Sequence, residues 1–379
     1  MKEFLIKELV NTDLTKEIKA IGFEENYAEF VADKYDYKTL KIFSLSAPQA
    51  NILKQTALSL GADCATHREV ITGKIDVADC ILGGSISTLK KIAQKLENQP
   101  FGLKYLKDAI LKQCEPKKIQ RTKLVGVLNL TKNSFSDGGK YWNFENAKEK
   151  LLSLIADGAD VIDIGAESTK PFSEPVSAKL QLEKLLPILE FTNKNCDIKI
   201  SIDTRSAEVA QEVLKLGNYI INDVSGLDYD PKMVQVVAKN NATVIIQHSK
   251  GTPLEMQILP KYKNVVDEIF FALNEKVKIA NNAGISDIIL DVGIGFGKTQ
   301  SHNIELIKRI KEFKSLNYPL MLGTSRKSFL GVENNDNDLK DSLTLAYDAI
   351  AIQAEVDYLR VHNVKLHKMF MNSWYSFNP

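Results

Sequence analysis

The sequence predicts an α/β fold in which a (β/α)8 barrel follows a small α/β N-terminal domain. From about residue 124, short apolar runs alternate with amphipathic segments, which is the pattern of parallel strands and their covering helices. The alternation repeats eight times within residues 124–379, close to the roughly 250 residues typical of such barrels. Each apolar run ends abruptly in polar residues, and a (β/α)8 barrel carries its functional groups at that end of its strands.

The eight expected strands are continuously apolar or β-prone, as buried parallel strands are. The polar side chains that follow them are therefore expected at the mouth of the barrel. The strands, with these polar residues in parentheses, are 125–128 (Asn129), 161–164 (Glu167, Thr169), 199–202 (Asp203), 220–221 (Asn222, Asp223), 244–246 (Gln247, His248), 288–290 (Asp291), 320–322 (Ser325, Arg326, Lys327) and 358–359 (Arg360, His362). Among the helices, the spacing predicts 144–155 and 206–216.

The first part of the chain has a different pattern, so we expect two domains, residues 1–117 and 118–379. In the first we expect strands at 41–45 and 79–82 and helices at 48–60, 86–96 and 103–111. Gly83 and Gly84 precede a helix but match no full phosphate-binding fingerprint, so a tight turn is expected there. Residues 114–121 are polar and basic and have the composition of a linker. No chemistry can be assigned to the first domain.

The composition indicates a cytoplasmic protein. A formal net charge of +1 gives no reason to expect nucleic acid or an anionic membrane as a partner. No apolar run approaches the ~18 residues that span a bilayer, and charges interrupt the first eight residues too often for a signal peptide. The four cysteines form no Cys-x-x-Cys pair, so reduced thiols are expected rather than zinc or a redox motif.

Asp203 and Asp291 form the strongest candidate pair, because each follows an apolar strand. A carboxylate in a barrel mouth can accept two parallel N–H donors from the edge of a guanidine-like ring, and Asn222 can both donate to and accept from such a ring. A helix N-cap is the structural alternative for Asp203, since a helix follows within three residues. The loop after Asp291 fits that alternative less well.

A second group of residues indicates an anion site. Thr324 to Ser328 follow the seventh strand and include two cations, and barrels frequently bind phosphate near loops seven and eight. Arg360 and His362 stand two residues apart on the eighth strand, which puts both side chains on the same side. At the end of the first strand, the amide oxygen of Asn129 is a candidate Mg²⁺ ligand. His248 and His302 are expected to be structural.

These motifs together resemble dihydropteroate synthase, a pterin-binding family, over residues 122–379. The resemblance rests on seven motifs that occur in the family's order: Asn129-x-Thr131-x-x-Ser134-Phe135-Ser136-Asp137-Gly138-Gly139, Glu167-Ser168-Thr169-x-Pro171, Ser201-Ile202-Asp203-Thr204, Ile221-Asn222-Asp223, Asp291-x-Gly293-x-Gly295-Phe296-Gly297-Lys298, Ser325-Arg326-Lys327-Ser328 and Arg360-Val361-His362. It implies a TIM-barrel transferase of folate biosynthesis. Such an enzyme condenses 6-hydroxymethyl-7,8-dihydropterin diphosphate with 4-aminobenzoate to give 7,8-dihydropteroate and diphosphate.

The resemblance also implies residue roles. The pterin would be held by Asp203, Asn222, Asp291 and Lys327, and the diphosphate with Mg²⁺ by Asn129, Arg360 and His362. The 4-aminobenzoate pocket, which sulfonamides also enter in this family, would be bordered by Thr169, Pro171, Phe296, Lys327 and Ser328. Asp203, Lys327, Arg360 and His362 would carry the catalysis. A homodimer through the last helices is implied as well, with 343–352 and 366–370 as the interface.

The chain departs from the family pattern at six positions. These are Lys132 and Asn133 in loop one, Lys170 in place of arginine, Gln247 in place of methionine, Val292 in place of proline and Asn363 in place of aspartate. Two other readings stay open. A methyltetrahydrofolate:corrinoid methyltransferase would share the pterin-reading residues but should lack the anion site, and a non-catalytic pterin-binding paralogue is supported only by the loop changes.

Overall fold

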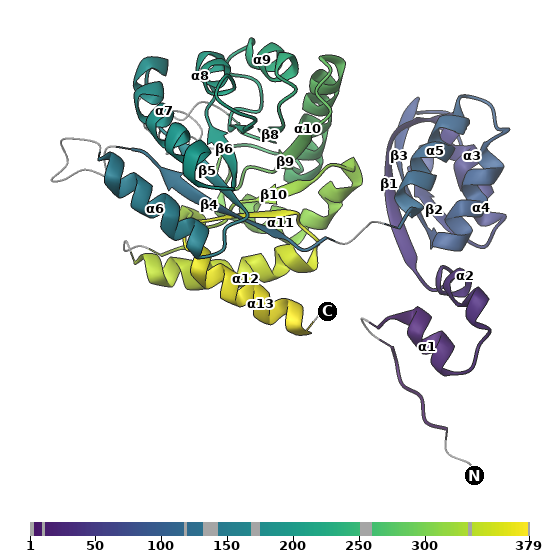
Figure 1. Cartoon of the computed structure of the whole chain (residues 1–379). Coiled ribbons are helices and arrows are strands. Elements are labelled where there is room, and N and C mark those ends of the chain that lie inside the picture. The colour runs from purple at the N-terminus through teal and green to yellow at the C-terminus, as the bar shows by residue number, and fades with distance from the viewer. Residues whose placement is uncertain are drawn as a thin grey trace. The chain divides into compact units, whose positions relative to one another are not determined.

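The structure is a computed structural model that describes residues 4–9, 12–116, 120–131, 143–167, 175–250, 260–332 and 336–377. The chain divides into two compact units, residues 1–118 and 119–379, which Figure 1 colours purple to blue and teal to yellow.

The first unit is a three-stranded antiparallel sheet covered by helices. Its helices and turns are α1 (Leu14–Ala20), η1 (Glu25–Tyr27), α2 (Ala28–Ala32), α3 (Ala47–Leu58), η2 (Arg68–Val70), α4 (Ile86–Leu96) and α5 (Leu103–Cys114), and its strands are β1 (Tyr37–Ser46), β2 (Asp63–Thr66) and β3 (Val77–Ser85). The strand order is β1-β3-β2. Buried side chains from the strands and from α3, α4 and α5 form a core of its own, with Leu53, Leu82 and Leu89 fully enclosed.

Two features of this unit differ from the sequence prediction. Gly83 and Gly84 do not form a turn but lie inside β3, where Gly83 pairs with Thr39 of β1. A Cβ on Gly83 would come within 2.4 Å of the Tyr37 hydroxyl, so glycine is there to admit the ring and not to bend the chain. The short elements α1, α2 and β2 had no counterpart in the prediction, because none carries an apolar run long enough to stand out.

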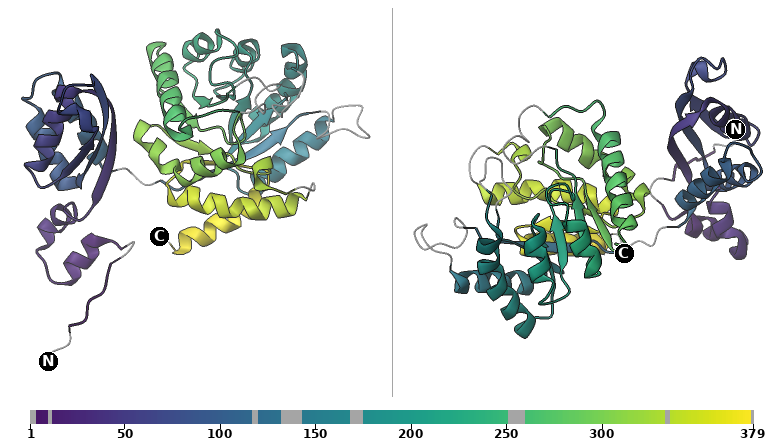
Figure 2. Two further views of the ribbon diagram at one scale, coloured as in Figure 1. Left: turned by 180° about the vertical axis from the view of Figure 1, so that it is seen from behind. Right: turned by 90° about the horizontal axis from the view of Figure 1, so that it is seen from above.

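The second unit is a closed barrel of eight parallel strands, as the sequence predicts. In order around the barrel these are β10 (Leu320–Leu322), β11 (Tyr358–Val361), β4 (Lys123–Asn129), β5 (Val161–Gly165), β6 (Lys199–Asp203), β7 (Ile220–Asp223), β8 (Val244–Gln247) and β9 (Ile288–Asp291). The helices surround the strands (Figures 1 and 2). They are α6 (Phe144–Ala156), α7 (Ala178–Asn195), α8 (Ala207–Val213), α9 (Met233–Lys239), α10 (Val265–Asn282), α11 (Gln300–Lys308), α12 (Asn337–Gln353) and α13 (Val364–Phe377), with 3-10 turns η3 (Ile310–Leu316) and η4 (Ser328–Leu330).

Strand register brings the expected polar residues to one end of the barrel. Asn129 pairs with Gly165, Gly165 with Asp203, and Asp203 with Asn222, while Gln247 pairs with Asp291. Glycine at 165 has a specific purpose, since a Cβ there would lie 3.2 Å from the Cβ of Asp203. The strands thus deliver their last side chains to a common mouth.

All four cysteines are free thiols, three of them buried. No helix in the described ranges is both long and apolar enough to cross a membrane.

Candidate active site

The centre of the barrel mouth is a group of buried polar side chains from β5, β6 and β7. Asn222, which is fully buried, donates from Nδ2 to Asp163 Oδ2 at 3.0 Å. Asp203 lies beside them at the end of β6. It does not cap the next helix, because Ser206 is the N-cap of α8. The expectation that Asp203 could be a helix N-cap is therefore wrong, and its carboxylate is left available at the mouth.

Several polar atoms in this group have no hydrogen-bond partner among the described residues. A buried polar atom without a partner costs free energy and is rare in folded proteins. Three such atoms lie on the neighbouring strands β5, β6 and β7: Asp163 Oδ1, Ser201 Oγ and Asn222 Oδ1. A fourth atom, Asp291 Oδ2, accepts no hydrogen bond and has an ion pair with Arg360. Such a concentration marks a place where a polar ligand supplies the missing partners.

Asp291 and the loop that follows it form the next wall. Asp291 Oδ1 accepts a hydrogen bond from the Gly293 backbone at 2.7 Å, which turns the chain sharply after β9. Gly293 has a left-handed φ of 68°, and a Cβ there would fall 1.8 Å from the backbone oxygen of His248. Lys298 is buried under this loop and donates to the backbone oxygens of Gly293 at 2.8 Å and Phe296 at 2.9 Å.

Arg360 connects the acidic group with the rest of the mouth. Its guanidinium lies 3.2 Å from Asp291 Oδ2 and 3.9 Å from Asp163 Oδ2, and it donates to Gln247 Oε1 at 3.0 Å. Gln247 is fully buried. Arg360 therefore lies against the carboxylates of Asp291 and Asp163, which the sequence pattern did not indicate.

Lys327 stands on the other side of Arg360. Its Nζ donates to the Ile294 backbone oxygen at 3.0 Å and lies 4.2 Å above the ring of Phe296. Burial and the nearby Arg360 charge lower the pKa of Lys327 to about 7, although Asp291 and Asp203 work against this. A lysine with this pKa can bind an anion or release a proton near neutral pH.

His362 is held in a neutral state. Its Nδ1 lies 3.0 Å from Ser325 Oγ, and Ser325 Oγ also accepts from the His362 backbone N–H at 3.2 Å. Burial first, and then the charge of Arg326, lower the pKa of His362 to about 3. The imidazole can therefore donate a hydrogen bond but carries no charge around pH 7.

The carboxyl group of Asp203 has a strongly raised pKa. Burial, followed by the negative charge of Asp163, raises the pKa of Asp203 to about 8, while Arg360 opposes the shift. The pKa of Asp163 is also raised, again by burial and against the charge of Arg360. A buried carboxylate pair with one shared arginine favours ligands that bring positive charge or N–H donors.

The remaining predicted site residues are partly outside this picture. Asn129 ends β4 at the mouth, and Ser328 is exposed at the start of η4. Thr169 and Pro171 lie outside the described residues, as do Lys132, Asn133 and Lys170. No group of three His, Cys, Asp or Glu side chains within the described ranges is placed to hold a metal ion.

Sequence reasoning missed two residues of this site, Asp163 and Ser201. Both stand inside their strands, β5 and β6, opposite each other in the strand register, whereas the sequence pattern singles out residues at strand ends. The available signal was a carboxylate in the otherwise apolar run Val161–Gly165. Gln247 was expected at the mouth as the polar end of the fifth strand, but no role was assigned to it, although a buried amide at a strand end needs a partner.

The two histidines that we expected to be structural have structural contacts. His248 Nδ1 lies 3.0 Å from Lys298 Nζ, and His302 completes the capping box at the start of α11 by accepting from the Thr299 backbone.

The model of the pterin-binding enzyme family matches residues 125–362, which is most of the barrel and includes every residue of the mouth described above. The chain belongs to the dihydropteroate synthase family. The expected resemblance is thereby confirmed, and the small N-terminal unit lies outside the matched region.

Curated relatives place the chain among these synthases. The dihydropteroate synthase of Synechocystis is 40% identical over 250 residues, covering 65% of this chain and 86% of the relative. The bifunctional dihydropteroate synthase/dihydropteroate reductase of Helicobacter pylori is 33% identical over 369 residues and is covered end to end, 96% of each chain. This chain spans only 40% of a probable bifunctional folylpolyglutamate synthase/dihydropteroate synthase from Halobacterium salinarum, to which it is 37% identical.

Solved structures of family members share the barrel. The Clostridium difficile dihydropteroate synthase, solved in the presence of pteroic acid, is 36% identical with a TM-score of 0.63 and covers 69% of this chain and 99% of its own. The Thermus thermophilus dihydropteroate synthase in complex with 4-aminobenzoate is 35% identical with a TM-score of 0.60, covering 68% and 95%.

Proposed function

We propose that the barrel joins 6-hydroxymethyl-7,8-dihydropterin diphosphate to 4-aminobenzoate, releasing diphosphate and forming 7,8-dihydropteroate. The observation that carries this proposal is the group of buried polar atoms beside Arg360, of which Asp163 Oδ1, Ser201 Oγ and Asn222 Oδ1 have no hydrogen-bond partner among the described residues. A pterin ring presents N–H donors and acceptors along one edge, and these would satisfy them. Membership of the synthase family gives the proposal its reaction.

The pterin-holding residues of the proposal are those that line this group. Asp291 and Asp163 would accept from the ring's N–H groups, and Asn222 would accept through its free Oδ1. Asp203 would lie beside the exocyclic methylene. When diphosphate leaves, the methylene becomes cationic, and a nearby carboxylate stabilises that charge. No protein nucleophile is needed, because the amine of 4-aminobenzoate attacks the methylene carbon itself.

The diphosphate would lie toward Lys327, Arg360 and His362. Lys327 and Arg360 would supply positive charge to the departing diphosphate, and neutral His362 would donate a hydrogen bond to it. Phe296 lies under Lys327, and with Ser328 it would border the 4-aminobenzoate pocket. Thr169 and Pro171 complete that pocket in the proposal.

Mg²⁺ is proposed as the cofactor, with the amide oxygen of Asn129 as its protein ligand. The donor set fits, because Mg²⁺ keeps several waters and binds through substrate phosphates rather than through a cage of side chains, and the described part of the chain offers no such cage. When bound, the ion neutralises diphosphate charge and makes it a better leaving group.

An assay of diphosphate release separates this proposal from its alternatives. The full-length protein, given Mg²⁺, the pterin diphosphate and 4-aminobenzoate, should release one diphosphate for each 7,8-dihydropteroate formed. A methyltransferase or a non-catalytic pterin-binding paralogue would release none. The second would still bind the pterin, which calorimetry with the pterin alcohol would detect.

A reductase activity is the second candidate function. It is favoured by the end-to-end match with the Helicobacter pylori bifunctional enzyme, which includes the N-terminal unit that the Synechocystis match leaves uncovered. Reduction would add a hydride and a proton across the C=N bond of the dihydropterin ring, with the hydride from a reduced nicotinamide or flavin. The test compares the full chain with a chain beginning at residue 119. Reductase activity should be present only in the former.

We further propose a cytoplasmic homodimer built from two domains, the N-terminal unit and the synthase barrel. Four free cysteines fit a reducing compartment. For the dimer, the support is a set of exposed large apolar side chains on α12 and α13: Leu339, Leu343, Ile350 and Met369.

A further inference from the structure

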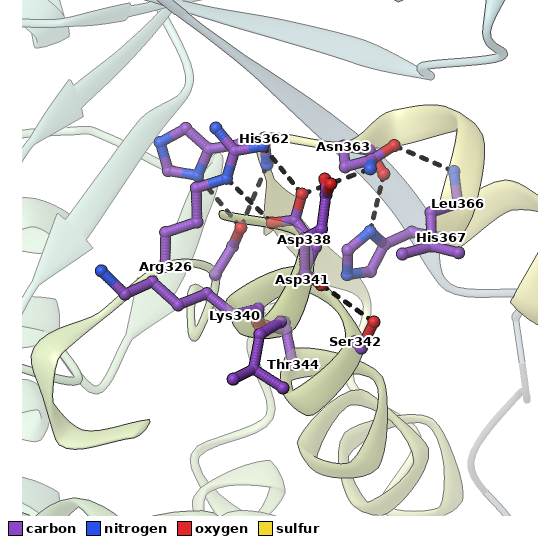
Figure 3. A network of polar contacts seen from close by, with 12 residues as sticks. Arg326, Asp338, Lys340, Asp341, Ser342, Thr344, His362, Asn363, Leu366 and His367 are labelled. Atoms are coloured by element: carbon purple, nitrogen blue, oxygen red, sulfur yellow. Dashed lines mark hydrogen bonds and ion pairs between the residues drawn. The ribbon is translucent and has the colours of Figure 1, made fainter. Parts of the chain in front are cut away.

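The side chain of Arg326 points away from the barrel mouth, whereas its neighbours Ser325 and Lys327 contact His362 and Ile294 there. Its side chain runs to α12, where Nε and NH2 donate to the two carboxylate oxygens of Asp341 at 2.8 and 2.7 Å. Asp341 is fully buried, and Figure 3 shows the pair in the middle of a network of polar contacts. A bidentate arginine–carboxylate pair fixes both position and orientation. Arg326, one of the two cations of the Ser325–Ser328 motif, is therefore bound within the protein.

The backbone of Arg326 is left-handed, with a φ of 58°. A residue with a side chain adopts this conformation at a cost in free energy, and it persists only where the surroundings hold it. The conformation lets consecutive side chains diverge. Arg326 reaches outward to α12, whereas Ser325 contacts His362 and Lys327 contacts Ile294 inside the mouth.

The carboxylate that holds Arg326 is itself held. Asn363 Nδ2 donates to Asp341 Oδ2 at 3.2 Å, and Asn363 Oδ1 accepts from the backbone of Leu366 at the start of α13. Asn363, Arg326 and Asp341 lie together in Figure 3. The position is one at which the family usually has aspartate. An aspartate would set a second carboxylate against Asp341 and lose the donor, so asparagine suits this network.

A second contact anchors the same segment at Thr324, two residues before Arg326. Thr324 Oγ1 donates to Asp348 Oδ1 of α12 at 3.0 Å, and Asp348 Oδ2 lies 3.2 Å from Nε2 of buried His367 on α13. Four consecutive residues, 324–327, are thus fixed by different partners. Two of those partners come from α12, outside the mouth.

We propose that Arg326 is a positioning residue of the synthase: its pairing with Asp341 holds the backbone turn that places Lys327 and the Ser325–His362 pair at the diphosphate end of the substrate. The proposal rests on the proposed condensation. Arg326 does not touch substrate, and it acts through its two chain neighbours. Its removal should weaken binding of the diphosphate more than binding of the pterin ring. Of the residues expected to hold the ring, only Lys327 adjoins Arg326, whereas Asp163, Asn222 and Asp291 belong to other strands.

The test uses the full-length protein with three variants. Arg326→Gly keeps the left-handed backbone free of strain but removes the clamp. Arg326→Lys keeps the charge without the bidentate fork. Arg309→Gly is the matched control, because Arg309 makes the same kind of bidentate pair, with Glu312 at 2.6 and 2.8 Å. It does so just past the end of α11, where the chain has returned to the opposite face of the barrel.

We expect Arg326→Gly to lose about 100-fold in kcat/KM for the pterin diphosphate, the order of loss that a misplacement of about 1 Å causes. Arg326→Lys should recover part of it, and Arg309→Gly should stay within about 3-fold of the parent. In calorimetry, Arg326→Gly should weaken the binding of inorganic diphosphate more than the binding of the pterin alcohol. A general loss of structure would weaken both probes and lower the Tm.

The proposal is overturned if Arg326→Gly matches Arg309→Gly in kcat/KM, or if both probes weaken equally. Should Arg326→Gly fail to fold, Arg326→Lys decides on the same criteria. Absence of condensation in the parent would contradict the proposed function instead. In that case the two binding probes still test Arg326, since they need no turnover.

Discussion

Asp203 is a carboxylate in a place that disfavours its charge. Burial and Asp163 together raise the pKa of Asp203 to about 8. Placing this acid where a cationic methylene is proposed to form therefore lowers the stability of the fold. The carboxylate gains a favourable interaction only when the cation forms beside it.

Asp203→Asn should abolish turnover and make the protein more stable at high pH. An unfolded aspartate has a pKa of about 3.9, so the folded state binds more protons between about pH 4 and pH 8 and loses stability as pH rises through that window. Asparagine removes this loss. The Tm of the variant should exceed that of the parent at pH 8.5 and equal it near pH 4. Asp228→Asn, at an exposed position, is the control and should show no such pH dependence.

Lys327 should control the alkaline side of the pH profile. Because the pKa of Lys327 is lowered to about 7, kcat/KM for the pterin diphosphate should fall as pH rises through that value and the ammonium is lost. His362, with a pKa near 3, should give no limb between pH 5 and 7. In Lys327→Arg the alkaline limb should disappear whatever activity is left, because arginine stays charged. A limb that persists would assign it to another group.

The sequence predicted those site residues that directly follow an apolar strand. Asp203, Asn222, Asp291 and Arg360 end strands, and the structure brings them to one mouth. The direction of Arg326 was out of reach, because it depends on a left-handed φ and on a carboxylate fifteen residues away. Asp163 escaped because it lies within a strand.

At the scale of elements, the loop after β9 owes its shape to one buried lysine. Lys298 holds two backbone oxygens of the loop and lies 3.0 Å from His248. Burial lowers the pKa of Lys298 well below its usual value. The Ile294 backbone oxygen and the Phe296 ring of this loop contact Lys327. Lys298 therefore helps to position Lys327 through the loop.

Lys298→Met should destabilise the fold and loosen this loop. The change leaves buried carbonyls without a donor, which should lower the free energy of unfolding by about 3 kcal/mol. Urea unfolding measures the loss. Lys278→Met, which removes an exposed i, i+3 pair with Glu275, is the control and should change stability by less than about 0.5 kcal/mol. Equal effects of the two variants would contradict the assigned role of Lys298.

Element boundaries followed the strength of the sequence signal. The expected helix 86–96 coincides with α4, where Ser85 caps the first turn, and the barrel strands fall where the apolar runs were. Helix 206–216 was drawn too long, because α8 ends at Val213. Gly83 and Gly84 were predicted as a turn because a glycine pair is typical of one, and only the packing of Tyr37 explains Gly83 inside a strand.

In the whole molecule, the inner faces of α12 and α13 anchor the segment at Lys327, and their outer faces are the proposed subunit interface. Their inner faces carry Asp341, Asp348 and His367, which anchor the segment at Lys327. Their outer faces expose Leu343, Ile350 and other large apolar side chains, as an interface between subunits would.

Replacing Leu343 and Ile350 together by aspartate should convert the proposed homodimer to a monomer, because each charge would have to be buried against the partner. Light scattering after gel filtration gives the mass. The matched control is Leu58→Asp with Ile71→Asp in the N-terminal unit, where both side chains are exposed, and it should leave the mass unchanged. A parent protein that is already monomeric would contradict the dimer.

We propose that the buried polar group and the cations beside it bind the two ends of one substrate. The most direct measurement is the release of diphosphate by the full-length protein from 6-hydroxymethyl-7,8-dihydropterin diphosphate, with and without 4-aminobenzoate. The account predicts stoichiometric diphosphate and 7,8-dihydropteroate with Mg²⁺ present and neither product in Asp203→Asn. A folded parent protein that binds the pterin but releases no diphosphate would contradict it.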